Sequence, residues 1–200
     1  MPQLGGAKHT NKPLNTTPVF YHLSLDGIAA VQSGSLDWVS YDKELEKWGE
    51  PIVAKTDTAL YGRFTYELMK YWRTVSSNPK ATKHELKHAR WIESVEKIVF
   101  SKSPMTPDWN NTRVINKNVK EEILKLKQKS GKNITIFGSP TLANSLIQLG
   151  LVDEYCLSVN PIVLGVGKFL FKEVKGAIKL KLVAEKTLKS GAVTLHYTAQ

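Results

Sequence analysis

Two short stretches of the chain combine small residues, a hydroxyl group and the expected start of a helix, which is a combination that binds phosphate. The first is Gly62-Arg63-Phe64-Thr65, which follows a predicted strand and opens a run with helical spacing. A helix N-terminus directs backbone N–H groups and a positive dipole end at an anion. Arg63 adds a guanidinium fork and Thr65 adds a hydroxyl. A helix cap with a solvated arginine is the alternative interpretation.

The second stretch is Gly138-Ser139-Pro140-Thr141, again between a predicted strand and a predicted helix. A small residue at such a junction lets a pyrophosphate approach the backbone, and proline suits the first helical turn. An N-cap formed by Ser139 is the alternative, and both interpretations can hold together. The GxGxxG fingerprint of other dinucleotide-binding folds is absent.

Hydrophobic patterning predicts the elements that position these stretches. Strands are predicted at residues 19–25, 58–61, 97–101, 112–115, 133–137, 153–159, 178–188 and 192–198. Helices are predicted at 42–48 (closed by Gly49 and Pro51), from 63 to 72, at 82–94 with a capping box, at 119–129 and at 141–150. Alternating strands and helices imply parallel pairing, and the short link at 189–191 implies an antiparallel C-terminal hairpin.

The sequence therefore predicts one α/β domain over residues 18–200, with a mixed, mainly parallel sheet flanked by helices. Residues 1–17 are polar and are predicted to be a disordered leader; they lack the apolar stretch of a secretory signal. A chain of 200 residues with 42% hydrophobic content can bury one sizeable core.

Composition also limits the partners and the compartment. No apolar run reaches the length of a membrane-spanning helix. The single cysteine, Cys156, excludes an intramolecular disulfide and a cysteine-based zinc site, and it favours a cytoplasmic protein. The net charge of +10 comes from scattered lysines without a nucleic-acid-binding signature, so solvated lysine faces are the preferred explanation. We expect neither nucleic acid nor membrane as a partner.

Seven motifs, taken in order, resemble the dihydrofolate-reductase-like superfamily. They are SLDGIA (24–29), LDW (36–38), LYGRFTYELMKYW (60–72), IVFSKS (98–103), IFGSPTLANSLIQLGLVDEY (136–155), NPIVLGVGKFLF (160–171) and SGAVTLHY (190–197). The nearest branch looks like the RibD C-terminal domain, the reductase part of bifunctional riboflavin-biosynthesis deaminase-reductases. The resemblance implies a three-layer fold with NADPH across the carboxyl ends of central strands. It also implies hydride transfer to a C=N or carbonyl group of a pterin, pyrimidine or related heterocycle.

The resemblance also assigns roles to individual residues of the cofactor site. The implied cofactor-binding residues are Ile28, Ala29, Gly62, Arg63, Thr65, Ser101, Lys102, Gly138, Ser139, Pro140, Thr141 and Leu142. Ser101 and Lys102 would face the adenosine 2′-phosphate, and a cation there favours NADPH over NADH. A solvated loop lysine is the alternative.

The substrate side rests on fewer residues. Trp38 resembles the tryptophan that begins the substrate-site helix of dihydrofolate reductases, and Asp42 falls about one turn later, where a proton-relaying acid is expected. Asp37 is the competing acid, and a solvated aspartate at the helix start is the alternative for Asp42. Tyr66 and Trp72 are candidates for walls of a flat ring site, although aromatic residues at helical spacing are mostly core.

The leading hypothesis is thus an NADPH-dependent reductase with a small heterocyclic substrate. A non-catalytic dinucleotide- or ligand-binding protein on the same fold is the alternative, and a basic nucleic-acid-binding protein is the third reading. The riboflavin-pathway relatives pair through their sheets, so the resemblance also implies a homodimer.

Overall fold

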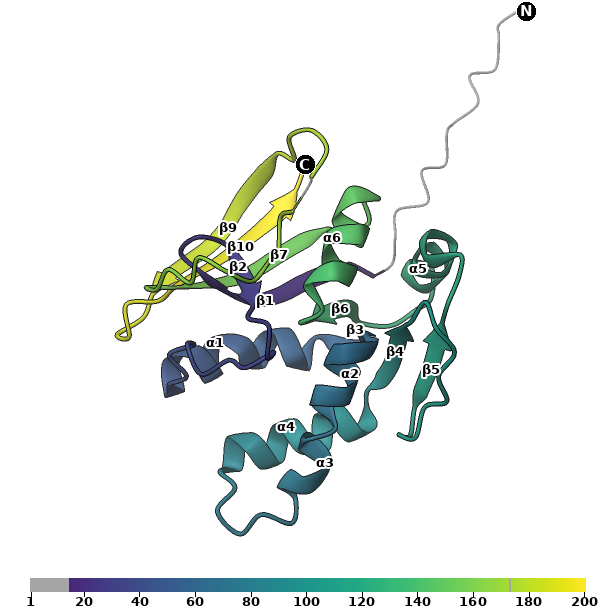
Figure 1. The fold of residues 1–200 in the computed structure, drawn as a ribbon, viewed down its shortest axis with the longest axis horizontal. Helices are drawn as coiled ribbons and strands as arrows, with labels where there is room; N and C mark the ends of the chain where they lie inside the picture. Colours follow the sequence, from purple (N-terminus) through teal and green to yellow (C-terminus); the bar gives the residue numbers. More distant parts are fainter. Residues whose placement is uncertain (1–14, 173) are drawn as a thin grey trace, which may run out of the picture.

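The computed structural model describes residues 15–172 and 174–200, and its centre is an eight-stranded mixed sheet (Figure 1). The strands run in the order β5-β4-β3-β6-β1-β7-β10-β9. Their bounds are β1 Pro18–Ser24, β3 Thr56–Gly62, β4 Glu96–Phe100, β5 Thr112–Ile115, β6 Asn133–Phe137, β7 Glu154–Asn160, β9 Leu180–Thr187 and β10 Val193–Ala199. The strands from β5 to β7 pair in parallel, and β10 is antiparallel to both neighbours. The predicted fold class, hairpin included, is confirmed.

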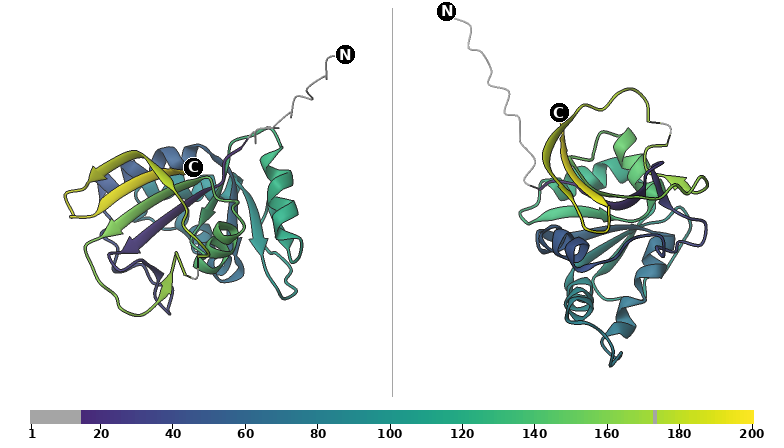
Figure 2. Two further views of the ribbon diagram at one scale, coloured as in Figure 1. Left: turned by 90° about the horizontal axis from the view of Figure 1, so that it is seen from above. Right: turned by 90° about the vertical axis from the view of Figure 1, so that its left-hand side faces the viewer.

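Helices cover both faces of the sheet (Figures 1 and 2). They are α1 Lys43–Ala54, α2 Arg63–Met69, α3 Trp72–Val75, α4 Lys83–Ser94, α5 Val119–Lys127 and α6 Pro140–Gln148. The first four lie on one face, and α5 and α6 pack on the other, where Tyr21 and Leu23 of β1 join their core. Within the described residues, no helix combines the length and apolar character that crossing a membrane requires.

The chain order of the strands marks one edge of the sheet as the expected place for a ligand. Strand β6 returns to lie between β3 and β1. The chain leaves β3 into α2 on one face, whereas it leaves β6 into α6 on the opposite face. Where neighbouring parallel strands continue to opposite faces, a crevice opens at their carboxyl ends, and ligands of open α/β sheets bind there. The carboxyl ends of β3 and β6, which we call the β3–β6 crevice, are therefore the edge where this rule predicts a ligand.

Helix α1 is longer than its sequence predicts. The predicted end at Gly49 and Pro51 is wrong, because the helix continues through both residues to Ala54. Gly49 is buried, and a Cβ atom at this position would lie 3.3 Å from Cζ of Phe20. Glycine here permits close packing of the helix on β1, and Pro51 sits on the exposed side. A local breaker signal was thus overridden by tertiary packing.

Besides shifts of one or two residues at the ends of several elements, the structure departs from the prediction in three other places. The helix predicted over 63–72 divides into α2 and α3. Two short strands, β2 (Ile28–Ala30) and β8 (Lys168–Phe169), form a second sheet that the sequence did not predict, because so few residues carry no periodicity. At the N-terminus, residues 15–17 are anchored: Thr17 is buried and its N–H donates to Oδ2 of Asp153 at 2.6 Å. The rest of the predicted leader, residues 1–14, lies outside the described residues.

The small sheet of β2 and β8 depends on one glycine. A Cβ atom on Gly167 would lie 2.5 Å from Cγ2 of Ile28 and 2.7 Å from the carbonyl oxygen of Ala30. Gly167→Ala should therefore lower the free energy of unfolding by about 1–3 kcal/mol, the usual cost of overpacking. Urea unfolding followed by circular dichroism measures it. The exposed neighbour Val166 provides the control Val166→Ala, and equal stability of the two variants would contradict the expectation.

Candidate functional site

The two predicted phosphate-binding stretches touch each other at the β3–β6 crevice. The backbone N–H of Gly62, at the end of β3, donates to Oγ of Ser139 at 2.6 Å. A Cβ atom on Gly138 would lie 3.0 Å from Cγ2 of Thr65, in the first turn of α2. The structure thus brings together two junctions that lie 76 residues apart in sequence, counted from Gly62 to Gly138.

The junction after β6 has an unusual backbone. Gly138 and Ser139 both adopt left-handed conformations, each with φ of 58°. Ser139 occupies the N-cap position of α6, but its side chain makes no cap hydrogen bond and accepts from Gly62 instead. The first-turn N–H groups of a helix have no acceptor within the helix, so those of Thr141 and Leu142 are oriented for an anion. The side chain of Leu142 is buried in the core, and Pro140 carries no N–H.

Arg63 extends from the β3 junction toward the loop after β4. Its Nη1 donates to Oγ of Ser103 at 3.0 Å and weakly to the carbonyl oxygen of Pro104 at 3.5 Å. Ser101 is buried, and its hydroxyl donates to the carbonyl oxygen of Ser103 at 2.7 Å, while Lys102 is exposed. The hydroxyl nearest to the guanidinium therefore belongs to Ser103, which the sequence analysis did not single out. Its place two residues after Ser101 was the available signal.

The turn after β1 is fixed by Asp26. Its Oδ1 accepts from Oγ of Ser24 at 2.6 Å, and its Oδ2 accepts from the N–H of Gly165 at 2.8 Å. The Ser24 hydroxyl, followed by the backbone donors, lowers the pKa of the Asp26 carboxyl below its usual value. This contact ties the turn to the loop before β8. It also positions β2, where Ile28 and Ala29 are buried.

The two candidate acids lie in ordinary polar environments. Oδ1 of Asp42 accepts from the N–H groups of Glu44 and Leu45, each at 2.8 Å, so Asp42 is the N-cap of α1. This is the helix-start role that was the alternative interpretation. Asp37 is exposed in the preceding loop. Trp38 precedes the helix instead of beginning it, and its Nε1 donates to the carbonyl oxygen of Ser35. A catalytic role for either acid stays a prediction.

The predicted aromatic wall needs correction. Tyr66 is fully buried, with its ring 6.2 Å from that of Trp109 and its hydroxyl 3.3 Å from Oδ1 of Asp108. A side chain without exposed surface cannot contact a diffusible ring, so Tyr66 is a core residue. Trp72 packs against His88, at 4.3 Å between ring centroids, on the same side of the sheet. Trp72 is only partly buried, so a substrate-binding role for Trp72 stays a prediction.

A buried polar group at the end of β1 escaped the sequence analysis. His22 is 8% exposed, its Nδ1 lies 2.8 Å from Oγ of Ser158, and its Nε2 lies 3.1 Å from the hydroxyl of Tyr41. Burial lowers the pKa of the His22 imidazole from 6.5 to about 4, so the ring is neutral at physiological pH. One polar residue inside an apolar strand was the only sequence signal, because Ser158 lies 136 residues away.

A second cluster of polar groups lies at the amino-terminal end of β7 and on the neighbouring strand β10. One donor atom each from Glu154, Cys156 and His196 falls within 4.8 Å of the others. Burial raises the pKa of the Cys156 thiol to about 12, and Nε2 of His196 is 2.8 Å from a carboxylate oxygen of Glu154. A metal would have to displace the thiol proton and disrupt this pair. We assign the cluster a structural role in joining β7 to β10.

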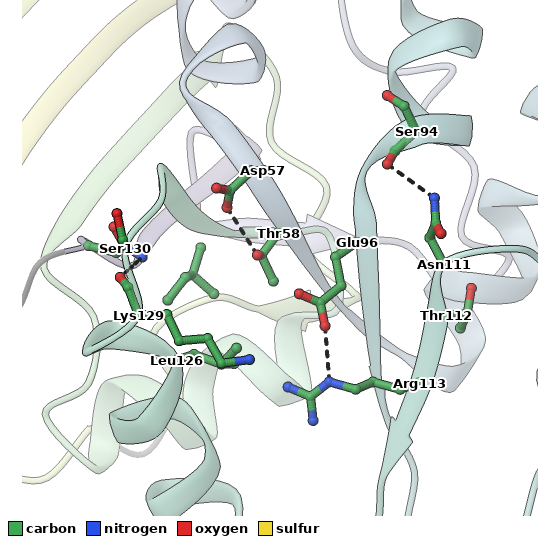
Figure 3. A pocket seen from close by; sticks show the side chains of 12 residues that line it. Asp57, Thr58, Ser94, Glu96, Asn111, Thr112, Arg113, Leu126, Lys129 and Ser130 are labelled. Carbon is green, nitrogen blue, oxygen red and sulfur yellow. Dashed lines mark hydrogen bonds and ion pairs between the residues drawn. The ribbon is translucent and has the colours of Figure 1, made fainter.

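A hollow of about 680 Å³ opens at the opposite, amino-terminal edge of the sheet (Figure 3). Several of its polar side chains already have partners: Arg113 pairs with Glu96 at 3.1 Å, and Asn111 donates to the backbone carbonyl oxygen of Ser94. Acidic and basic groups are mixed along its wall, which favours no ligand charge. The carboxyl-end crevice has the better claim to function, because topology, helix ends and Arg63 converge there.

Comparison with known proteins identifies the family and the fold. Residues 17–194 match the family model of the RibD C-terminal domain. The uncharacterized protein YyaP of Bacillus subtilis (strain 168) is 37% identical over 175 residues, which cover 88% of this chain and 90% of YyaP. A pyrimidine reductase-like protein of Corynebacterium diphtheriae has a TM-score of 0.65 at 16% identity, covering 95% of this chain and 93% of that one. Enterococcus faecalis dihydrofolate reductase, complexed with NADP(H) and RAB-propyl, has a TM-score of 0.61 at 15% identity, covering 94% and 98%. These solved structures share the fold.

The low pKa of His22 makes the stability of the protein sensitive to acid. Below pH 6.5 the unfolded chain takes up a proton at His22 that the folded protein does not take up until about pH 4. Stability is therefore complete above pH 6.5 and falls toward pH 4, by up to about 3 kcal/mol from this residue. Burial lowers the pKa of His88 to about 4 as well, which adds a loss of the same sign.

Urea unfolding at pH 7.5 and pH 4.5 measures this dependence. The variant His22→Gln cannot take up the proton, so it should lose markedly less stability between the two pH values than the wild type. His88→Gln is the matched comparison. A His22→Gln protein that weakens as steeply as the wild type would refute the assignment.

Proposed function

The chain belongs to the RibD C-terminal domain family, and from this premise we propose that it is an NADPH-dependent reductase that transfers a hydride to a pterin, pyrimidine or related heterocycle. The observation that carries the proposal is the hydrogen bond between Gly62 and Ser139. It joins the two strand-to-helix junctions at the β3–β6 crevice. Fold alone would not suffice for this step, since one fold hosts many functions.

The residues at the crevice fit a dinucleotide. A side chain at Gly138 would press against Thr65, so the glycine keeps the backbone bare where a pyrophosphate must approach. The N-terminus of α6 and the guanidinium of Arg63 supply favourable charge for the phosphates. Lys102, exposed next to the Arg63–Ser103 contact, is suited to a 2′-phosphate and favours NADPH over NADH.

The bound cofactor would supply the hydride, and the chain would position both rings. Ile28 and Ala29, held in β2 beside the end of β1, are the proposed floor under the nicotinamide. Asp42 and Asp37 remain proposed proton sources, although the capping bonds to Oδ1 of Asp42 restrain its movement.

The capping role of Asp42 favours one alternative, a dinucleotide- or ligand-binding protein without turnover. Cofactor binding without NADPH oxidation across pterins, dihydropterins and aminopyrimidines would support that alternative. Oxidation of NADPH with any of these rings, followed at the nicotinamide absorbance band, would support the reductase.

Fluorescence titration tests the cofactor directly. We expect NADPH to bind with a Kd below about 1 mM and more tightly than NADH, in line with ordinary cofactor and substrate affinities. Failure of both nucleotides to bind in this range would overturn the proposed function.

Two substitutions separate the roles of the cations. Arg63→Ala should weaken both nucleotides by about tenfold or more, because it removes a charge-assisted contact to phosphates common to both. Lys102→Ala should weaken NADPH several-fold and leave NADH unchanged. Lys129→Ala, in the hollow at the opposite edge of the sheet, is the charge-matched control. Equal losses for NADPH and NADH in Lys102→Ala would argue against the 2′-phosphate role.

We also propose that two copies pair along β9. Residues 181–187 are exposed, including Leu182 and Val183, and β9 is the edge of the main sheet. A long exposed edge strand with apolar side chains is a template for pairing. Light scattering should report a dimer for the wild type and a monomer for Val183→Lys, with Lys181→Ala as the control. A monomeric wild type would contradict the pairing.

A further inference from the structure

We propose that Tyr41, held in place by His22, is the group that binds the substrate ring. This inference rests on the proposed function, because it names the substrate side of the same crevice. It assigns a binding residue, Tyr41, and a positioning residue, His22. It does not make either residue the proton donor.

The register of the sheet places His22 beside the cofactor junction. Strands β1 and β6 are parallel neighbours with Phe20 opposite Phe137. Strand β6 ends at Phe137, so the Gly138-Ser139 junction begins where β1 continues toward His22, two residues after Phe20. The ring of Phe20 links the two sides, with its centroid 5.6 Å from that of His22 and 5.7 Å from that of Phe137.

His22 also points to the correct face of the sheet. Side chains alternate along a strand, so His22 shares the face of Phe20. Phe20 stacks on Trp48 of α1 at 5.2 Å, which identifies this face as the one covered by α1 and α2. His22 therefore lies on the face of the sheet that α1 and α2 cover.

The polar partners of His22 form a closed network behind it. Ser158 and Asn160 are buried on β7, opposite His22 and Ser24 in the register. The amide of Asn160 donates to the carbonyl oxygen of Leu23 at 3.2 Å, and its Oδ1 accepts from the N–H of Ser40 at 3.3 Å. Buried polar groups are costly unless they are satisfied, and a satisfied network is rigid. Through Asn160, this network holds Ser40, the residue before Tyr41, against the end of β1.

The ring of Tyr41 is exposed to solvent, while its hydroxyl is hydrogen-bonded to the buried His22. The residue is 60% exposed, yet its hydroxyl lies 3.1 Å from Nε2 of His22 and its ring meets the imidazole edge-on at 5.3 Å. An exposed aromatic residue that is fixed at its polar end loses little entropy on binding, and its face suits a flat ring. Tyr41 is thus prepared for a ligand before the ligand arrives.

The hydrogen-bond roles of His22 and Tyr41 determine what the Tyr41 hydroxyl offers to a ring. His22 is neutral at physiological pH, and burial, with a smaller contribution from Glu46, raises the pKa of the Tyr41 hydroxyl above its usual value. If Nε2 donates to Tyr41, the hydroxyl proton is free for a ring carbonyl or nitrogen. If Tyr41 donates to Nε2, its oxygen accepts from a ring N–H. The first arrangement suits a hydrogen-bond acceptor on the ring, and the second suits a hydrogen-bond donor.

The experiment measures ring binding without requiring turnover. Pterin, whose own fluorescence reports its binding, is titrated into the protein with and without saturating NADP⁺, and 6-aminouracil is titrated by calorimetry as the pyrimidine probe. The variants are Tyr41→Phe, His22→Ala, His22→Gln and the double variant Tyr41→Phe/His22→Ala. Tyr197→Phe is the matched control, because it removes a tyrosine hydroxyl from the opposite face of the sheet. Circular dichroism and NADPH titration verify that each variant is folded.

We expect Tyr41→Phe and His22→Ala each to weaken ring binding about tenfold, the effect of one hydrogen bond, with NADPH affinity unchanged within about twofold. Glutamine can reach the hydroxyl of Tyr41, so His22→Gln should recover most of the affinity. Because His22 acts through Tyr41, the double variant should bind no more weakly than either single variant.

Three outcomes would overturn the inference while leaving the cofactor proposal intact: neither ring binds to a wild type that binds NADPH, the single variants bind rings as the wild type does, or the two losses multiply in the double variant. A wild type that does not bind NADPH is a different result, and it would overturn the proposed function instead.

Discussion

The hydrogen bond from the Gly62 N–H to the Ser139 hydroxyl is the contact on which the geometry of the crevice depends. It joins the ends of two parallel strands whose following helices leave in opposite directions, so it sets the separation of two helix N-termini. Ser139 adopts a left-handed backbone conformation, which costs about 1–2 kcal/mol for a residue with a side chain. The hydrogen bond offsets part of this cost, and Gly138 accepts the same conformation without penalty. Strained backbone that the surroundings hold in place is a common property of ligand sites.

The elements of this fold follow from local patterns wherever the pattern is long enough. Strands β5 and β6 occupy the predicted residues, because each is an apolar run bounded by polar or turn residues. Prediction failed where distant packing decided the outcome. Helix α1 continues through Gly49 because the helix lies against Phe20, a contact that no local rule contains. Strands β2 and β8 pair across about 140 residues and are too short for any periodicity to be visible.

The candidate site divides in the same way. The backbone parts, Gly62 to Thr65 and Gly138 to Leu142, were predictable since strand, small residue and helix follow one another in the chain. Side-chain roles were harder, because they depend on partners far away in sequence. Asp42 could be placed at the helix start but not assigned its two backbone donors. His22 gave almost no signal, since its meaning comes from Ser158 on a strand that becomes its neighbour only in the fold.

The charges along the carboxyl edge of the sheet are arranged in the order of the strands. Arg63 and Lys102 lie toward β3 and β4, whereas the neutral His22 and Tyr41 lie toward β1 and β7. A long-range attraction would therefore draw the anionic part of a ligand to one end of the crevice. At the other end lie the carboxylates of Asp26 and Asp42, which do not attract an anion, so hydrogen-bond geometry contributes more to what binds there. A dinucleotide with a polyanionic end and a neutral reactive ring matches this gradient in one orientation only, with its ring directed at β1. The same gradient leaves the place beside Tyr41 to a second, uncharged ring, so the electrostatics of the edge and the buried network behind His22 support one arrangement.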